Sequence, residues 1–332
     1  VYTDINKSHA NHRCMVEKTE SGAKSILNKL KIKASLLASP EFVRKNYIKG
    51  KYDVEVAFCE GYSTKSIGNS KKRNCKKIAW VHTDMIVNPW SEKVFGSEEE
   101  EKKCYENFDA IVCVAETMKE AFIQKYGMAK KVHVLYNPID FDSIIEKSKE
   151  KNNFDFGNGM KFILAGSFVK VKGLDRFVNV CERLKNDGKF FSVLIMGDGE
   201  EKEYIKKIIA EKKLGDTIKT LDFQTNPYKY IAHSDVYVCS SYAEGYSTSV
   251  SEAVALSVPV ITTECSGMRE IFGENECGII CENSEDGLYN AMKKVLENPM
   301  LLEKFSNEEK KRANDFSLQK RVKAIEDFLE SV

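Results

Sequence analysis

The sequence predicts an α/β protein with two doubly wound domains, each a parallel β-sheet covered by helices on both faces. Its 332 residues exceed what one hydrophobic core usually organises, which is about 100–150 residues. Short, nearly continuous apolar runs alternate with longer segments of helical periodicity, as strands and helices do in a buried parallel sheet. A polar, Asn- and Gly-rich stretch at 147–161 divides this pattern into two series.

Ten apolar runs are predicted to be strands, because they are short and rich in β-branched residues. The first series comprises 53–58, 76–81, 109–114 and 131–136, and the second comprises 161–166, 191–197, 217–223, 235–241, 258–264 and 277–282. Helical spacing is clearest over Leu174–Asn186, Lys202–Lys213, Val250–Leu256, Leu288–Leu296 and Leu318–Leu329.

These elements predict three parts of the chain. Residues 1–156 form an N-terminal domain, 157–316 form a second domain, and 317–332 carry a C-terminal helix that we expect to pack back on the first domain. The chain opens with VYTD, which resembles the end of a strand. The first domain is therefore expected to lack its first strand.

Composition and charge disfavour several classes of protein. A formal net charge of +1 argues against a nucleic-acid partner, and the absence of any run of 18 apolar residues argues against a membrane span. The ten cysteines lie mostly within apolar runs, as reduced cysteines do in a cytosolic protein. The Cys277/Cys281 pair has no second Cys or His pair nearby, so we expect no metal site there.

The pentapeptide EGYST occurs twice, at Glu60–Thr64 and at Glu244–Thr248, and each copy follows a predicted strand. Ligands of open α/β sheets bind beyond the carboxyl ends of the strands, so both copies lie where a ligand would bind. The copies differ eight positions after the glutamate, where Glu252 follows the second copy and Gly68 follows the first. We therefore expect the second copy to carry the chemistry.

The second copy combines two acids with a predicted helix start. Ser247–Ser249 are residue types that cap helices, so a helix is predicted to begin there and to run to Leu256. Free amides at such a start suit phosphate, and carboxylates accept hydrogen bonds from hydroxyls. Glu244 and Glu252 flank this helix start, so the site suits a ligand that has a phosphate group between two hydroxylated parts. A nucleotide sugar is such a ligand. The alternative is that the two glutamates are an ordinary loop acid and a solvated helix acid.

Several segments, in order, resemble a known family. They are GSFVKVKGLD (166–175), LIMGDGEEKE (194–203), the run from LDFQTNPYKY to SGMREI (221–271) and GIICE (278–282), with KKIAWVHTDM (76–85) and VLYNPID (134–140) matching less sharply. Residues 161–282 resemble the donor-binding domain of retaining glycosyltransferases of the GT-B fold, family 4 (glycosyl transferases group 1). The similarity is to bacterial members that build capsules or exopolysaccharides.

The resemblance implies a GT-B architecture, with two Rossmann-like domains facing each other across a cleft, and roles for residues of the second domain. Glu252 would hold the ribose, Glu244 would face the transferred sugar, and the loop at Gln224 would meet the base. The remaining donor-binding positions are Gly166, Ser167, Gly245, Tyr246, Ser247 and Thr248. Gly197 and Gly199 in MGDGE do not complete G-x-G-x-x-G, which disfavours a dinucleotide dehydrogenase.

Lys172 matches the family lysine that stabilises charge on the leaving phosphate. With this cation in place we expect neither metal nor cofactor. The chain departs from the family at Ser167, where an arginine is usual. Either Lys170 replaces that cation or Ser167 donates a weaker hydrogen bond, and a solvated turn lysine is the alternative reading of Lys172.

Three residues of the first domain are further candidates, His82 from the resemblance and Asp84 and Glu60 from their positions after predicted strands. His82 ends a predicted strand and would point toward the donor sugar as a catalytic residue; the alternative is a histidine satisfied by the backbone. Asp84 would assist it or act only as a cap. Glu60, in the first EGYST copy, would form part of the acceptor-side wall.

Residues 24–51 contain eight Lys or Arg and one Glu, interleaved with leucines and isoleucines. They are either a helix pair with solvated lysines or a patch that attaches to an anionic membrane surface. The second reading suits a cytoplasmic enzyme that is peripheral at the inner face of the plasma membrane and uses a polyprenyl-linked or glycan acceptor.

These expectations combine into a retaining, metal-independent hexosyl-type glycosyltransferase that uses a nucleotide diphosphate sugar, with a UDP-sugar favoured. The alternatives are a non-catalytic partner subunit of a glycosyltransferase, a nucleotide-sugar 2-epimerase and a glycan phosphorylase.

Overall fold

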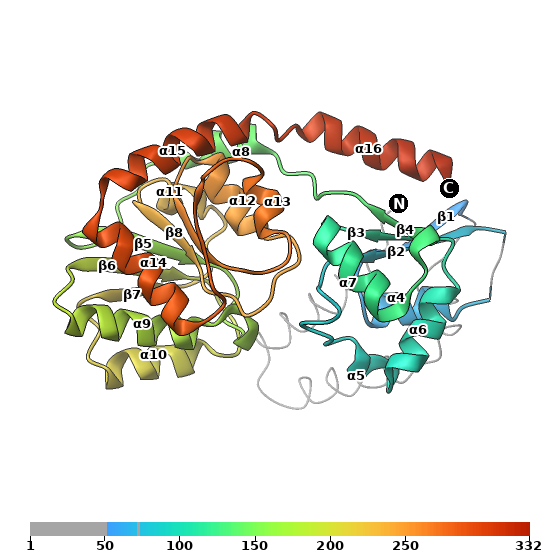
Figure 1. Ribbon diagram of the computed structural model, residues 1–332, viewed down its shortest axis with the longest axis horizontal. Helices are drawn as coiled ribbons and strands as arrows, with labels where there is room; N and C mark the ends of the chain where they lie inside the picture. The colour runs from blue at the N-terminus through green and yellow to red at the C-terminus, as the bar shows by residue number, and fades with distance from the viewer. Residues whose placement is uncertain (1–51, 72–73) are drawn as a thin grey trace, which may run out of the picture. The chain divides into compact units, whose positions relative to one another are not determined.

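A computed structural model describes residues 52–71 and 74–332 of the chain (Figure 1). By its contacts the chain divides after Leu135: Tyr136–Ala324 form the second unit, and the described residues before Tyr136 form the first unit together with Ile325–Val332. The expectations for VYTD and for the basic segment 24–51 lie outside the described residues. The predicted class, two Rossmann-like α/β units, is confirmed.

The described part of the first unit holds a parallel sheet in the order β1-β2-β3-β4. Its strands are β1 (Val54–Ala57), β2 (Lys76–Val81), β3 (Ala110–Cys113) and β4 (Val132–Val134). Its helices are α4 (Tyr62–Gly68), α5 (Glu92–Phe95), α6 (Glu98–Glu106) and α7 (Glu116–Tyr126). The two central strands are buried along nearly their whole length, which explains their continuous apolar runs.

The second unit holds a six-stranded parallel sheet in the order β10-β9-β8-β5-β6-β7. Its strands are β5 (Met160–Ala165), β6 (Phe191–Met196), β7 (Ile218–Leu221), β8 (Val236–Cys239), β9 (Val260–Thr263) and β10 (Gly278–Cys281). The strand order reverses between β5 and β8. This topological switch point is where doubly wound sheets bind their ligands.

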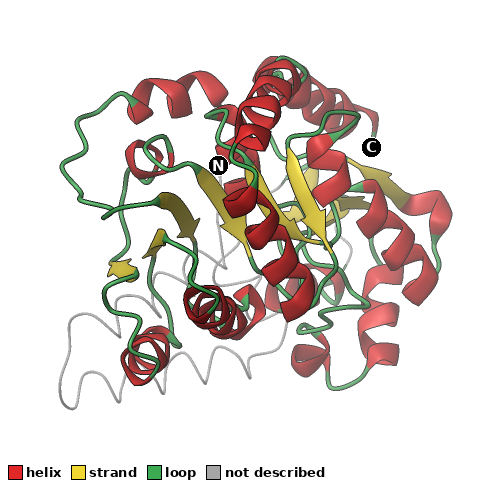
Figure 2. Ribbon diagram, turned by 60° about the vertical axis from the view of Figure 1, so that its left-hand side comes forward, coloured by secondary structure: helices red, strands yellow, loops and turns green. Residues whose placement is uncertain are grey.

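Two groups of helices cover this sheet, and Figure 1 shows them on its opposite sides. One group is α9 (Leu174–Asn186), α10 (Lys202–Glu211) and α14 (Glu285–Glu297); the other includes α8 (Phe141–Ser148), α11 (Tyr228–Ile231), α12 (Thr248–Ala255) and α15 (Met300–Ala313). A short helix, α13 (Met268–Phe272), follows β9. Figure 2 shows the strands lying among these helices.

All ten predicted strands are present, and their ends lie within two residues of the predicted runs. The helix predicted over Leu174–Asn186 has those limits, because Phe177, Cys181 and Leu184 follow one another at helical spacing on its buried face. The second unit begins at Tyr136 rather than near residue 157, since α8 packs against α11 and α12 of that unit.

The chain ends in α16 (Leu318–Ser331), the helix expected from the spacing of Leu318–Leu329. Its last residues group with the first unit, where the ring of Phe328 lies 5.0 Å from that of His133. In the part of the chain that the structure describes, no helix is both long and apolar enough to cross a membrane.

Candidate functional site

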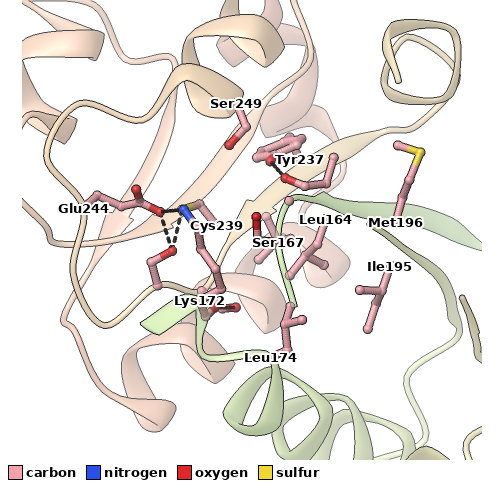
Figure 3. Close-up of a pocket in the computed structure, with 15 residues that line it drawn as sticks. Leu164, Ser167, Lys172, Leu174, Ile195, Met196, Tyr237, Cys239, Glu244 and Ser249 are labelled. Atoms are coloured by element: carbon pink, nitrogen blue, oxygen red, sulfur yellow. Dashed lines mark hydrogen bonds and ion pairs between the residues drawn. The ribbon is translucent and has the colours of Figure 1, made fainter. Parts of the chain in front are cut away.

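A small pocket lies at the switch point of the six-stranded sheet, at the carboxyl ends of β5, β6 and β8 (Figure 3). Four of the residues singled out from the sequence line it together: Gly166, Ser167, Lys172 and Glu244. Ser249, in the first turn of α12, lies on its rim as well. The sequence motifs therefore converge where the topology predicts a ligand.

Lys172 and Glu244 form an ion pair in this pocket. The lysine Nζ lies 2.6 Å from Glu244 Oε1, which also accepts a 2.5 Å hydrogen bond from Ser241 Oγ. Burial, the largest single effect, lowers the pKa of Lys172, but attraction by Glu244, Cys239 and Cys265 and the hydrogen bond to Glu244 together raise that pKa above the ordinary lysine value. The lysine is therefore a fixed cation at neutral pH.

The loop after β8 is held by Arg176, a residue that the sequence analysis did not single out. Its buried guanidinium donates to the carbonyl oxygens of Ser240, at 2.8 Å, and Ser241, at 2.6 Å. A third bond, 2.8 Å long, reaches Asn283 Oδ1. These bonds fix the start of the loop that leads to Glu244. The arginine lies 64 residues from Ser240 in the chain, so no local pattern marks it.

The glycine pair of MGDGE has a packing role under the pocket. A Cβ atom on Gly197 would lie 1.8 Å from the carbonyl oxygen of Gly166, which is closer than any side chain permits. The ends of β5 and β6 can therefore approach only with glycine at this position. This explains a glycine pair that does not continue as a dinucleotide fingerprint.

The predicted helix start in the second EGYST copy is confirmed. Helix α12 begins at Thr248, and the side chain of its N-cap, Ser247, accepts a hydrogen bond from Val250 N at 3.4 Å. Gly245, Tyr246 and Ser247 are buried and Thr248 is exposed. The Tyr246 hydroxyl bonds to Arg321, and Tyr246 is not among the residues that line the pocket.

Glu252 lies inside α12, outside the pocket that Lys172 and Glu244 line. Burial raises the pKa of its carboxyl above the ordinary value, and a 3.2 Å hydrogen bond from the Tyr228 hydroxyl opposes that rise. Burial and the Glu252 charge together raise the pKa of Tyr228 to about 12. Nearby, Gln224 accepts a 3.3 Å bond from the hydroxyl of Tyr230.

Ser167 stands where the family usually has an arginine, and the structure shows whether Lys170 or Ser167 itself lies at the pocket. Lys170 is exposed, lies outside the pocket and pairs with Asp175 at 2.7 Å. Ser167 lines the pocket and is exposed. A hydroxyl, rather than a second cation, therefore stands at the position after Gly166.

In the first unit, Glu60 differs from what was expected of it. Its carboxylate is buried, 3% exposed, and accepts hydrogen bonds from the backbone N–H groups of His82 and Thr83, the latter at 2.6 Å. Burial raises its pKa to about 7. A side chain enclosed in this way cannot form a wall for an acceptor, so its role is to hold the loop after β2.

His82 and Asp84 lie on that same loop. Burial lowers the pKa of His82 to about 4, so the imidazole is neutral at pH 7, and its Nε2 has no hydrogen-bond partner among the described residues. Asp84 Oδ1 accepts from the amides of Ile86 and Val87, each at 2.9 Å. Asp84 thus caps a turn, and its assistance to His82 stays a prediction.

The second unit is a doubly wound α/β domain with a polar pocket at its switch point, where such domains bind nucleotides and other ligands. Comparison with known families makes this more specific. Residues 145–312 match the model described as glycosyl transferases group 1, and residues 27–143 match the model described as glycosyltransferase family 4. The first match covers half of the chain, and the chain belongs to the glycosyl transferases group 1 family.

Two curated bacterial proteins are among the relatives of this chain. The chain is 33% identical over 229 residues to N-acetylgalactosamine-N,N'-diacetylbacillosaminyl-diphospho-undecaprenol 4-alpha-N-acetylgalactosaminyltransferase of Campylobacter jejuni, covering 68% of this chain and 60% of the relative. It is 29% identical over 147 residues to the O-antigen biosynthesis glycosyltransferase WclY of Escherichia coli, covering 43% of this chain and 40% of the relative. The chain thus spans 60% or less of these curated relatives.

Solved structures confirm the fold. HepE of Anabaena, in complex with UDP, matches with a TM-score of 0.71 at 17% identity, over 92% of this chain and 84% of that chain. Sucrose-phosphate synthase of Thermosynechococcus elongatus matches with a TM-score of 0.72 at 16% identity, over 93% of this chain and 78% of that chain. These proteins have the GT-B fold that the sequence motifs indicated.

Within residues 52–71 and 74–332, no three His, Cys, Asp or Glu side chains gather as metal ligands would. The independence from metal that the resemblance implies stays a prediction.

Proposed function

We propose that this protein is a retaining glycosyltransferase that uses a nucleotide diphosphate sugar, with a UDP-sugar favoured, in the synthesis of bacterial cell-surface polysaccharide such as capsule. The observation that carries the proposal is the pairing of Lys172 with Glu244 at the switch point, beside the start of α12. Family membership supports sugar transfer, and the position of the pair supports a donor bound to the second unit.

The chemistry follows from charge. As the bond between the anomeric carbon and the phosphate oxygen breaks, negative charge grows on that oxygen, and the Lys172 ammonium stabilises it. The Glu244 carboxylate accepts hydrogen bonds from the hydroxyls of the transferred sugar. The acceptor oxygen bonds to the anomeric carbon on the face that the phosphate leaves, and its proton passes to the phosphate. No metal takes part in this scheme.

The acceptor is proposed to be a glycan or a polyprenyl-linked sugar. The Campylobacter relative is named for a substrate linked to diphospho-undecaprenol, and the Escherichia relative for O-antigen synthesis. A lipid-linked acceptor would place a cytoplasmic enzyme at the inner face of the plasma membrane, with residues 24–51 as the basic attachment. Flotation with anionic liposomes tests this: binding at low salt that is lost at high salt supports it, and no binding at low salt opposes it.

The function is tested by incubating the protein with a panel of nucleotide sugars and a polyprenyl diphosphate sugar acceptor. We expect transfer that persists in EDTA and a product whose anomeric configuration, read by NMR, matches that of the donor. Inversion would refute retention, and loss of activity in EDTA would refute metal independence. Nucleotide binding without transfer or hydrolysis would indicate a non-catalytic partner subunit, and a changed C2 configuration of the sugar would indicate an epimerase.

A further inference from the structure

Arg321, on α16, connects three segments of the second unit that are far apart in the chain. Its Nη1 donates to the carbonyl oxygen of Asn137 at 2.5 Å, and its Nη2 donates to the Tyr246 hydroxyl at 3.0 Å. Asn137 follows β4, whereas Tyr246 belongs to the second EGYST copy. One side chain of the last helix therefore contacts the loop that carries Glu244.

Aromatic rings surround the same guanidinium. Its central carbon lies 4.5 Å from the ring centre of Phe316 and 5.5 Å from those of Tyr136 and Tyr246. The two tyrosine rings lie 5.5 Å apart, and the Tyr136 hydroxyl donates to Glu270 Oε2 at 2.9 Å. We call these four residues, Tyr136, Tyr246, Phe316 and Arg321, the Arg321 cluster.

The loop backbone between Glu244 and α12 is also tightly constrained at Gly267. A Cβ atom on Gly267 would lie 2.3 Å from the carbonyl oxygen of Gly245 and 3.2 Å from the Cα of Tyr246. Gly267 has a φ of 75°, a conformation that glycine adopts at little cost. The loop is thus packed against Gly267, and the Tyr246 side chain anchors it to the Arg321 cluster.

We propose that Arg321 is a positioning residue for the donor site: it fixes Tyr246, and through Tyr246 the peptide groups that join Glu244 to Ser247, the N-cap of α12. The inference rests on the proposed function, because it assigns those peptide groups to the donor. A preorganised site binds more tightly than one that must order on binding, since the ordering cost is already met. The last helix is therefore part of the donor site, although none of its residues lines the pocket.

The cluster requires a guanidinium rather than a simple positive charge. Two bonds in different directions and contact with three rings need a planar group with several fixed donors. A lysine ammonium at this position would keep the charge but could not make both bonds while contacting the rings. Arg321→Lys should therefore resemble Arg321→Ala, whereas a purely electrostatic role would leave Arg321→Lys close to the wild type.

Hydrogen exchange of the intact chain tests the positioning directly and requires no ligand. The amides of Val250 and Ser251 bond to the side chain and carbonyl of Ser247, so they report whether the loop holds its place. We expect their exchange to rise about tenfold in Arg321→Ala and Arg321→Lys, and less in Tyr246→Phe. Lys320→Ala, an exposed position on the same helix, is the matched control and should exchange as the wild type does.

Calorimetric titration with UDP is the second measurement. We expect Arg321→Ala to bind about tenfold more weakly, the size expected for one or two charge-assisted hydrogen bonds, with Lys320→Ala unchanged. Unchanged exchange at Val250 and Ser251 in Arg321→Ala would overturn the positioning role. If exchange rises but the wild type binds no nucleotide, the proposed function fails while the structural role of Arg321 stands. Altered exchange with unaltered UDP affinity would refute the link to the donor.

Discussion

The ammonium of Lys172 and the carboxylate of Glu244 lie 2.6 Å apart, and of the described residues that line the switch-point pocket Lys172 is the one cation. In this state the lysine is neutralised by the acid that is proposed to face the transferred sugar. A diphosphate entering the pocket would compete with Glu244 for the ammonium, and the released carboxylate would become available to sugar hydroxyls. Binding of the donor would then release both Lys172 and Glu244 from their ion pair in the same step.

Lys172→Ala is expected to lower turnover by about 100-fold, the size expected for the loss of one preorganised charge stabiliser. The fold should persist, because the pair lines a pocket and neither residue belongs to the buried core. Steady-state kinetics with the active donor checks this. Lys170→Ala is the matched control: Lys170 is exposed, pairs with Asp175 and should be dispensable. Undiminished turnover in Lys172→Ala would remove the lysine from the mechanism.

Glu252→Ala is expected to weaken nucleotide binding, since Glu252 is proposed to hold the ribose hydroxyls. Tyr228→Phe should give a smaller loss of about three- to tenfold, because it removes the 3.2 Å hydrogen bond that opposes the effect of burial on the Glu252 carboxyl. Titration with UDP measures both. Glu60→Gln is the comparison from the first EGYST copy and should bind UDP as the wild type does. Equal losses in Glu60→Gln and Glu252→Ala would contradict the choice between the copies.

The two EGYST copies show what sequence can and cannot predict here. The strands before them were predictable, because continuous apolar runs leave few alternatives to buried parallel strands. The start of α12 was predictable from Ser247, because capping is local. The burial of Glu60 was not predictable, since it depends on the amides of His82 and Thr83, more than twenty residues away.

The sequence analysis did not identify Arg176 or Arg321, because their contacts are also with residues that are distant in the chain. Arg176 bonds to carbonyl groups 64 and 65 residues away, and Arg321 bonds to Asn137, 184 residues away. Periodicity and capping rules act within a few residues, so they carry no information on such contacts. Lys172 and Glu244, 72 residues apart, could each be singled out because the family resemblance covers both, but their ion pair was not predicted.

Glu60 should make the stability of the first unit depend on pH. Its folded pKa of about 7 exceeds the ordinary value of 4.5, so the folded state binds the proton more tightly than the unfolded state. This contribution to stability is complete below pH 4.5 and is lost as pH rises through 7. It amounts to roughly 3 kcal/mol at about 1.36 kcal/mol per pKa unit. Glu60→Gln keeps an acceptor oxygen for the two amides but does not titrate.

Both tryptophans of the chain, Trp80 and Trp90, lie in the first unit, so tryptophan fluorescence follows the unfolding of that unit. The stability of the wild type relative to Glu60→Gln should fall between pH 4.5 and pH 7.5 in urea titrations. A difference that stays constant over this range would show that the folded pKa of Glu60 is not raised.

Glu309 offers a separate test in the second unit. Its side chain on α15 is buried, and neither carboxyl oxygen has a hydrogen-bond partner among the described residues. Burial raises its pKa well above the ordinary value, so the folded state holds the carboxyl proton more tightly than the unfolded state does. This tighter binding of the Glu309 proton stabilises the folded state fully below pH 4.5, and the stabilisation is lost as pH rises. Glu309→Leu should raise the free energy of unfolding at pH 7 by about 1–3 kcal/mol, since no polar atom is then buried without a partner.

Two further variants separate the causes. Glu309→Gln keeps a buried polar group but cannot ionise, so its gain over the wild type should be absent at pH 4 and grow toward pH 7. Glu303→Gln, at an exposed position of the same helix, should leave the unfolding temperature unchanged in calorimetry. If Glu309→Leu is instead less stable than the wild type at pH 7, the carboxyl makes a stabilising contact, and burial without a partner is the wrong description of this site.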